Sequence, residues 1–282
     1  EAYLKAPRPP QAPATVALRT RSALRWSEAF GGIDLGALKL GHLEGLLGDL
    51  QEAGWSPMTL RREVAYLRSF FRWCIAHEYI VKSPAIALPT YPARSVREHK
   101  ALEDHEIARL LDACRDGYTC RVERDGVAWL LKEEPPTWLY PIVLTALRTL
   151  LRISAILSLT WDDVDLEKRV IRVRAGNQKT RVSHSVPIAS DLLAWLASRT
   201  RAASDRVFPD APDRVAVWRS FKAAAKRAHL DATLHDLRRT GATWLLEHGV
   251  ALAVVQKLGG WSRPTVLLQY YAKVHDDSLR DA

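Results

Sequence analysis

The chain has 282 residues, 48% of them hydrophobic, which is enough to bury a core and predicts two domains, because single cores stop growing near this size. No segment approaches the roughly 20 apolar residues of a bilayer span, and the first residues lack the apolar stretch of a signal peptide, so we expect a cytoplasmic protein without membrane contact. The formal net charge is +9, with 12 Lys and Arg against 8 Asp and Glu in residues 1–95 and 29 against 24 in residues 96–282. A surplus shared by both halves suits a polyanionic partner such as DNA or RNA, although a basic surface that serves solubility explains it equally well.

The cysteines Cys74, Cys114 and Cys120 form neither a C-x-x-C pair nor a pattern with the spacing of zinc ligands. We interpret them as reduced thiols and expect neither a disulfide framework nor a zinc site.

The N-terminal third is predicted to be helical after a short arm. Residues 1–13 contain four prolines and are expected to form a flexible, extended arm, and residues 14–88 form the first domain. Its clearest helix starts at Ser56, a plausible N-cap followed by Pro57, and its apolar residues recur every three or four positions. The opposite face carries the bases Arg61, Arg62, Arg68 and Arg72. They are typical of a helix that lies along a phosphate backbone, but also of an ordinary solvated face.

A stretch rich in proline and bases, residues 89–100, is predicted to be the linker to a second domain, residues 101–282. We expect a helix from Glu103, an insertion or hairpin within residues 116–137, and a single helix over residues 138–160. The β-branched alternation that follows predicts a hairpin about residues 175–177, and helices return from Ser190. The fold class is thus mainly α with a small antiparallel β-sheet.

Polar residues in the second domain are candidates for chemistry. Arg152 is predicted to lie in an apolar helix, where an unpaired guanidinium is costly and needs an anion. A structural partner such as Asp162 or Asp163 satisfies that need as simply as a ligand does. His235 and Arg238 are three residues apart on one helical face, near a helix start that Asp231 or Thr233 would cap, and this pair suits a phosphate.

In chain order these residues, together with Lys179 and a C-terminal tyrosine, make the sequence resemble the tyrosine recombinase (phage integrase) family. The segments that carry the resemblance include "RISAILSLTWDDVDL", "KTRVSHSVPI", "LHDLRRTGATWLLEHGV" and "VVQKLGGWS". The resemblance implies a helical core-binding domain and a catalytic domain that together clamp double-stranded DNA carrying specific recombination sites. It also implies assembly as a tetramer on synapsed DNA.

The resemblance further implies DNA strand transesterification through a 3′-phosphotyrosyl link, which requires neither a metal nor another cofactor. Arg152 and Arg238 would clamp the phosphate, His235 would accept a proton or donate a hydrogen bond, and Lys179 would protonate the leaving oxygen. Trp261 occupies the position of a second family histidine, and its indole N–H can donate to a phosphate.

The nucleophile is one of two adjacent tyrosines. Tyr271 is followed by Ala-Lys-Val, which matches the family's longer-spaced form, whereas Tyr270 matches the spacing typical of the Gly-Gly-Trp form. We favour Tyr271 and keep Tyr270 as its rival. Further DNA contacts are expected from Arg219, Lys222 and Lys226, for which a solvated face is an equal alternative, and from Arg239.

The sequence also departs from the family near Arg152. Leu150 replaces the glycine of the usual Thr-Gly-x-Arg box, and Ala155 replaces an acid that supports the active-site hydrogen bonds. A catalytically impaired DNA-binding regulator or architectural protein with this fold is therefore the main alternative. A related strand-nicking topoisomerase suits the small helical N-terminal domain less well.

Overall fold

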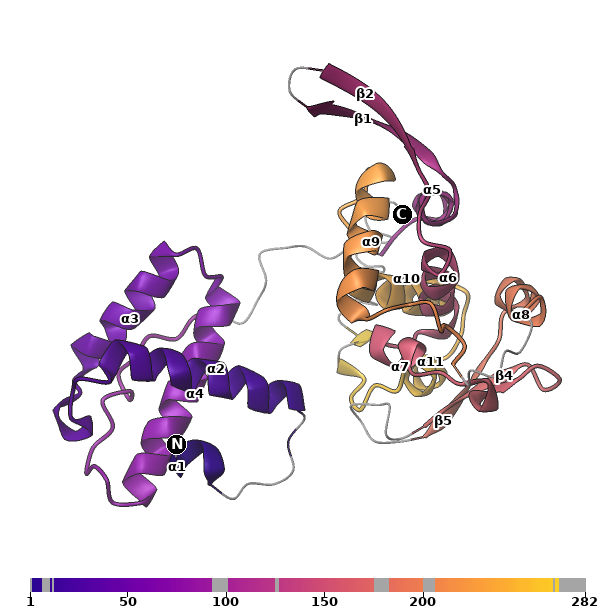
Figure 1. Cartoon of the computed structure of the whole chain (residues 1–282). Coiled ribbons are helices and arrows are strands. Elements are labelled where there is room, and N and C mark those ends of the chain that lie inside the picture. Colours follow the sequence, from indigo (N-terminus) through magenta and orange to yellow (C-terminus); the bar gives the residue numbers. More distant parts are fainter. Residues whose placement is uncertain are drawn as a thin grey trace, which may run out of the picture. The chain divides into compact units, whose positions relative to one another are not determined.

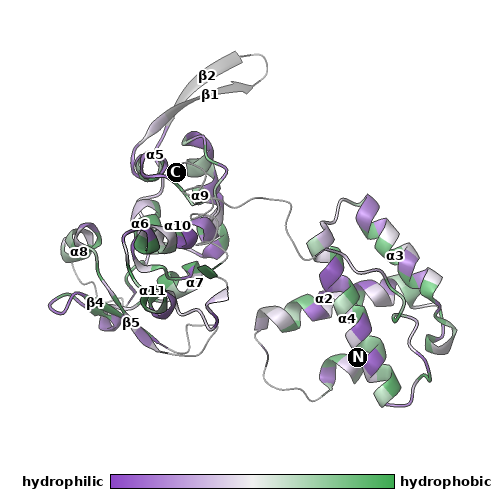
Figure 2. Ribbon diagram, turned by 180° about the vertical axis from the view of Figure 1, so that it is seen from behind, coloured by the Kyte–Doolittle hydropathy of each residue, from purple (hydrophilic) through white to green (hydrophobic). Residues whose placement is uncertain are grey.

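A computed structural model describes residues 2–6, 11, 13–92, 101–124, 127–174, 183–199, 206–265 and 267–268, with the backbone alone for residues 14 and 119–132. The chain divides into two compact units, Glu1–Glu98 and His99–Ala282 (Figure 1). The helices of both units mix polar and apolar residues (Figure 2). No helix within the described ranges combines the length and apolarity that crossing a bilayer would require.

The first unit consists of helices around one apolar cluster. They are α1 (Ala2–Lys5), α2 (Pro13–Phe30), the 3-10 turn η1 (Leu35–Ala37), α3 (Leu40–Glu52) and α4 (Pro57–Ala76). The predicted start of α4 is confirmed, because Ser56 accepts a hydrogen bond from the Thr59 amide and Pro57 takes the first helical position. The predicted apolar face is buried, namely Leu60, Val64, Leu67, Phe71 and Cys74.

The expectation of an extended arm is wrong for residues 2–5, which form the helix α1. Tyr3 is only 4% exposed, and its ring lies edge-on to Phe70 and Trp73 of α4 at centroid distances of 5.2 and 5.6 Å. Its hydroxyl donates to Ser69 Oγ at 3.2 Å. Burial of one large aromatic ring therefore outweighs the proline-rich composition that follows it.

A buried carboxylate joins α2 to α4. Glu63, 2% exposed, accepts hydrogen bonds of 2.8 Å from Ser22 Oγ, Arg25 Nη1 and Trp26 Nε1. These three donors from one helix satisfy the buried charge and fix how α2 packs on α4.

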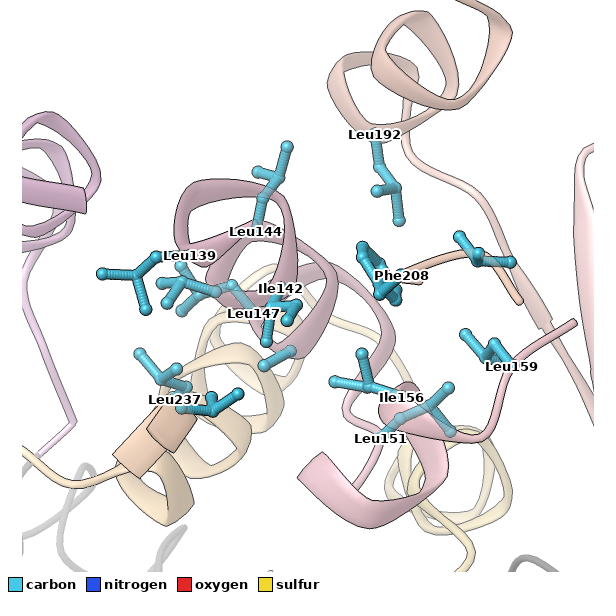
Figure 3. Close-up of a cluster of buried hydrophobic side chains, with 14 of the residues drawn as sticks. Leu139, Ile142, Leu144, Leu147, Leu151, Ile156, Leu159, Leu192, Phe208 and Leu237 are labelled. Carbon is cyan, nitrogen blue, oxygen red and sulfur yellow. The ribbon is translucent and has the colours of Figure 1, made fainter. Parts of the chain in front are cut away.

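The second unit is mainly helical. Its helices are α5 (Asp104–Arg115), α6 (Leu139–Thr149), α7 (Ile153–Leu157), η2 (Trp161–Asp163), α8 (Ser190–Ala197), α9 (Arg214–Arg227), α10 (Leu234–Glu247) and α11 (Leu252–Gly259). Helix α6 is buried on nearly all sides. Figure 3 shows its side chains Leu139, Ile142, Leu144 and Leu147 in one cluster with Leu237 of α10 and Leu192 of α8.

The strands form two antiparallel sheets. Strands β1 (Tyr118–Arg124) and β2 (Val127–Glu133) pair as a hairpin that extends away from the helices of this unit (Figure 1). Strands β3 (Val164–Asp165), β4 (Val170–Val173) and β5 (His184–Pro187) form the second sheet in chain order. Both predicted hairpins and the fold class are confirmed, while the expected turn at residues 175–177 lies outside the described residues.

The helix predicted over residues 138–160 is wrong, because the chain breaks between α6 and α7. Leu150 caps α6 in the left-handed conformation, with φ of 57°, and Arg152 has an extended backbone as the N-cap of α7. No glycine or proline signals this break. Leu150 is instead held by burial, since it is 1% exposed and packs against Ala242 and Leu246 of α10 and Val255 of α11.

Candidate active site

Arg152 lies where the chain leaves α6 and enters α7, not inside a helix as predicted. Its side chain is half-buried. Among the described residues no carboxylate forms an ion pair with it, and the expected candidate Asp163 is instead bonded to Arg174 at 2.5 Å. The guanidinium is thus partly desolvated without a protein anion, within the described part of the chain.

The start of α10 places His235 and Arg238. Thr233 caps the helix by accepting from the Asp236 amide, and Asp236 in return accepts from the Thr233 amide at 2.8 Å and its hydroxyl at 2.7 Å. This capping box confirms Thr233, not Asp231, as the cap. His235 and Arg238 then lie one turn apart on the same side of the first turns.

Arg238 is almost completely buried, with 2% of its surface exposed. Its Nη1 donates to the Leu150 carbonyl at 2.6 Å and its Nη2 to the Gly259 carbonyl. The guanidinium also stacks on the Trp261 ring, 3.9 Å from the centroid. Arg238 therefore ties together the end of α6 and the end of α11, as well as being a candidate phosphate ligand.

The two glycines of the Gly-Gly-Trp segment are required for steric reasons. A Cβ on Gly259 would lie 1.8 Å from the Trp261 ring, and Gly260 ends α11 in the left-handed conformation with φ of 61°. These two glycines allow the chain to turn and the indole to fold back beneath Arg238.

The pKa of His235 is lowered from its ordinary value. Desolvation is the largest cause, Arg238 and Arg152 lower the pKa further through their positive charges, and Asp236 partly opposes them. Desolvation also lowers the pKa of Arg152, but a guanidinium keeps its proton at neutral pH. The site thus combines a neutral imidazole, able to accept a proton, with two cations.

These side chains meet in a pocket of about 540 Å³ that the starts of α7, α9 and α10 surround. Arg152 and the pair His235 and Arg238, predicted from two separate segments, all line it. Arg214 and Trp218 of α9 line it too, and sequence reasoning missed both. The cap residue Asp213 marks the start of α9, but only the fold shows that this start lies beside α10.

The remaining predicted catalytic residues are only partly placed. Trp261 lies under Arg238, whereas Lys179, Tyr270 and Tyr271 lie outside the described residues. Ala155, which stands where the family keeps an acid, is 2% exposed in the apolar core. Backbone carbonyls therefore support Arg238 on the side of α6 and α11.

Two of the four predicted basic residues of α4 bond to backbone carbonyls. Arg68 is half-buried and donates to the Leu88 carbonyl at 2.7 Å, and Arg61 donates to the Tyr91 carbonyl at 2.9 Å. Both arginines thus hold the segment that returns along α4. Arg62 and Arg72 are exposed and available to a phosphate.

Two of the predicted basic residues of α9 and α10 lie close to acidic side chains. Lys222 Nζ lies 3.5 Å from Asp231, and Arg239 Nη1 lies 3.5 Å from Asp236. Arg219 and Lys226 are exposed.

No metal site is found among the described side chains, and the two cysteines among them are not reactive. No group of three or more His, Cys, Asp or Glu residues there is placed to hold a metal ion. Burial raises the pKa of Cys74 to about 11 and that of Cys114 to about 12, so both thiols stay protonated.

The second unit is mainly helical, and its pocket gathers arginines and a histidine, which are side chains that suit an anionic group. The model of the phage integrase family matches residues 100–278. The chain therefore belongs to the phage integrase family, and its relatives are tyrosine recombinases and integrases.

Two relatives show the extent of the match. Tyrosine recombinase XerA of Thermococcus kodakarensis is 32% identical over 249 residues, which cover 84% of this chain and 78% of the relative. The integrase of Salmonella phage P22 is 28% identical over 207 residues, 67% of this chain but only 47% of the relative. The chain thus spans about half the length of the phage P22 protein.

Solved structures share the fold. A lambda integrase dimer bound to a COC′ core site matches with a TM-score of 0.72 at 18% identity, covering 92% of this chain and 89% of that one. The Tn1549 transposon integrase in complex with a circular intermediate DNA matches with a TM-score of 0.71 at 19% identity, covering 97% and 95%.

Proposed function

We propose that the protein is a site-specific DNA recombinase that cuts and rejoins strands through a 3′-phosphotyrosyl intermediate. The observation that carries this proposal is the pocket where Arg152, His235 and Arg238 meet. Arg152 has no carboxylate partner among the described residues, so an external phosphate is the anion that suits it. Membership of the phage integrase family supports the same function.

The proposed reaction assigns a role to each group. The phenolic oxygen of Tyr271 attacks phosphorus, the bond from phosphorus to the 5′ oxygen breaks, and the phenolic proton passes to His235. The 5′ oxygen takes a proton from Lys179. Arg152 and Arg238 stabilise the charge on the non-bridging oxygens, which is the largest contribution expected of a site without a metal. The phosphotyrosyl link conserves the bond energy, so rejoining is the same reaction in reverse.

The proposed partner is double-stranded DNA with specific recombination sites, bound by both units and synapsed by a tetramer. The shared basic surplus supports contact by both units. One structural neighbour is a lambda integrase tetramer bound to a Holliday junction. A DNA substrate agrees with the expected cytoplasmic location.

The impaired alternative gains no support from the site. Loss of the family's acid at Ala155 does not leave Arg238 unsupported, because the Leu150 and Gly259 carbonyls accept from it. The cations, the pocket and the neutral histidine support the catalytic reading.

A nicked suicide duplex tests the proposal. A duplex is first selected for binding from a randomised pool, then nicked so that the cleaved fragment diffuses away. We expect an adduct that resists SDS, forms without metal or nucleotide, and disappears with Arg152→Ala. Tight binding of the selected duplex without any adduct would establish the impaired alternative instead.

A further inference from the structure

Helix α9 presents apolar side chains to the same pocket that holds the arginines. Val215 and Trp218 line the pocket, and each is 50% exposed. Large exposed apolar groups beside polar ones mark a surface that contacts a ligand. Val217, Phe221 and Ala224 of the same helix are fully buried in the core, so the exposure of Val215 and Trp218 is not due to loose packing of α9.

The start of α9 is fixed in place. Asp213 caps the helix by accepting from the Ala216 amide at 2.7 Å, and Lys222 contacts Asp231 just before α10. Arg214 and Trp218 are four residues apart and share a face, and both line the pocket. The helix therefore offers an indole and a guanidinium side by side, already positioned.

The pocket is larger than a phosphate requires. Its volume of about 540 Å³ falls within the range of about 300–1,000 Å³ that holds a small organic ligand. If Arg152 and Arg238 bind the phosphate, the remaining apolar lining faces what is bonded to that phosphate. In DNA this is deoxyribose, whose C2′ carries only hydrogen, whereas in RNA the same carbon carries a hydroxyl.

We propose that Trp218 and Val215 form a wall that packs on the deoxyribose next to the phosphate held by Arg152 and Arg238, while Arg214 contacts the neighbouring phosphate. Trp218 is then a specificity residue that favours a sugar without a 2′ substituent, because a hydroxyl against the indole would lose water without gaining a partner and a larger 2′ group would not fit between the sugar and the indole. This inference rests on the proposed function and specifies the substrate contact within it.

The test compares Trp218→Ala, Trp218→Phe and the control Trp244→Ala on the selected suicide duplex. Trp244 lies on α10, is 38% exposed and stacks on His248 outside the pocket lining. We expect the initial rate of adduct formation to fall about tenfold with Trp218→Ala, to be largely retained with Trp218→Phe, and to stay unchanged with Trp244→Ala.

Modified duplexes identify the group that Trp218 contacts. A 2′-O-methyl group is placed on each nucleotide flanking the scissile phosphate in turn, since this group cannot itself attack phosphorus. At one of the two positions, the 2′-O-methyl group should slow adduct formation by the wild-type protein about tenfold. It should slow adduct formation by Trp218→Ala less than about threefold. An abasic nucleotide at the same position should change the rate of adduct formation by the same factor in the wild-type protein and in Trp218→Ala.

Three outcomes would overturn the inference. They are a wild-type rate for Trp218→Ala, equal slowing of both proteins by 2′-O-methyl, or a loss with the abasic nucleotide that depends on Trp218 and indicates base stacking. Absence of any wild-type adduct would contradict the proposed function alone. The same comparisons are then made on duplex affinity, where Trp218→Ala must still weaken binding to unmodified duplex more than to 2′-O-methyl duplex.

Discussion

At the scale of single residues, the two arginines of the site have different roles in the fold. Arg238 is buried and donates to two backbone carbonyls, so it is part of the structure before any substrate binds. Arg152 has no such partner among the described residues, and desolvation lowers its pKa. Arg238 is thus a structural residue as well as a proposed catalytic one, and Arg152 is held ready for an anion.

Lysine substitutions separate these roles. Arg238→Lys loses the planar fork and should lower the free energy of unfolding by about 2–3 kcal/mol, because hydrogen bonds to charged groups contribute about that much. Arg152→Lys should change it by less than about 0.5 kcal/mol. Both should reduce adduct formation about 100-fold or more. Urea unfolding checks the stabilities, and an Arg238→Lys protein as stable as wild type would contradict the structural role.

The lowered pKa of His235 predicts the acid limb of the pH profile. The neutral imidazole accepts a proton and the imidazolium does not, so activity is lost as pH falls through the pKa in the folded protein. Because this pKa lies below the ordinary value of about 6.5, the midpoint of the acid limb of adduct formation should lie below about pH 6.5. The initial rate against pH checks this prediction. His235→Gln should remove the limb, and a wild-type midpoint above 6.5 would refute the assignment.

At the scale of elements, the break between α6 and α7 shapes the site. It turns the Leu150 carbonyl toward Arg238 and places Arg152 at the start of α7. The family's glycine at position 150 suits the left-handed backbone, whereas here a buried leucine adopts it. The apolar contacts of Leu150 with α10 and α11 offset the strain.

The variant Leu150→Gly compares the free-energy cost of the left-handed backbone with the stabilisation from burial of the leucine side chain. Relief of left-handed strain gains about 1–2 kcal/mol, but deletion of a buried leucine costs about 2–5 kcal/mol, so the variant should be less stable overall. Arg169 is the matched control, since it is exposed with φ of 51°, and Arg169→Gly should be neutral or stabilise by up to about 1 kcal/mol. The check is chemical denaturation of both variants. Stabilisation by Leu150→Gly would show that packing of this side chain contributes little.

The sequence predicts regular elements better than the contacts between them. The face of α4 and the hairpins follow from periodicity and turn residues. The break at Leu150 and the docking of Tyr3 do not, because tertiary burial decides them against local preference. The binding of Arg61 and Arg68 to carbonyls, and the approach of Arg214 and Trp218 to the site, depend on neighbours far along the chain. A pattern on one helix cannot reveal them.

At the scale of the whole molecule, each unit has exposed basic side chains that a DNA phosphate backbone could contact. They are Arg62 and Arg72 on α4 in the first unit, and Arg219 and Lys226 on α9 in the second. If both units contact one DNA duplex, each basic side chain that neutralises a phosphate contributes to the salt dependence of binding.

Paired alanine substitutions test contact by both units. The change of Arg62 and Arg72, or of Arg219 and Lys226, should each reduce the slope of log affinity against log salt by about 2, and all four together by about 4. Arg68→Ala is the control, since its bonds to the Leu88 and Ala85 carbonyls predict lower stability with little change of slope. Duplex binding at several salt concentrations gives the slopes. A change from one unit's pair alone would contradict contact by both units.

The most direct measurement of the central claim is the chemical identity of the residue joined to DNA. The adduct from the suicide duplex is digested with nuclease and protease, and the peptide that carries the residual 3′ nucleotide is sequenced by mass spectrometry. The account predicts a phosphotyrosyl nucleotide on Tyr271, lost in Tyr271→Phe and kept in Tyr270→Phe. A nucleotide on Tyr270 would exchange the two tyrosines within the same mechanism. A wild-type protein that binds its selected duplex but carries no nucleotide on either tyrosine would contradict the proposed phosphotyrosyl mechanism.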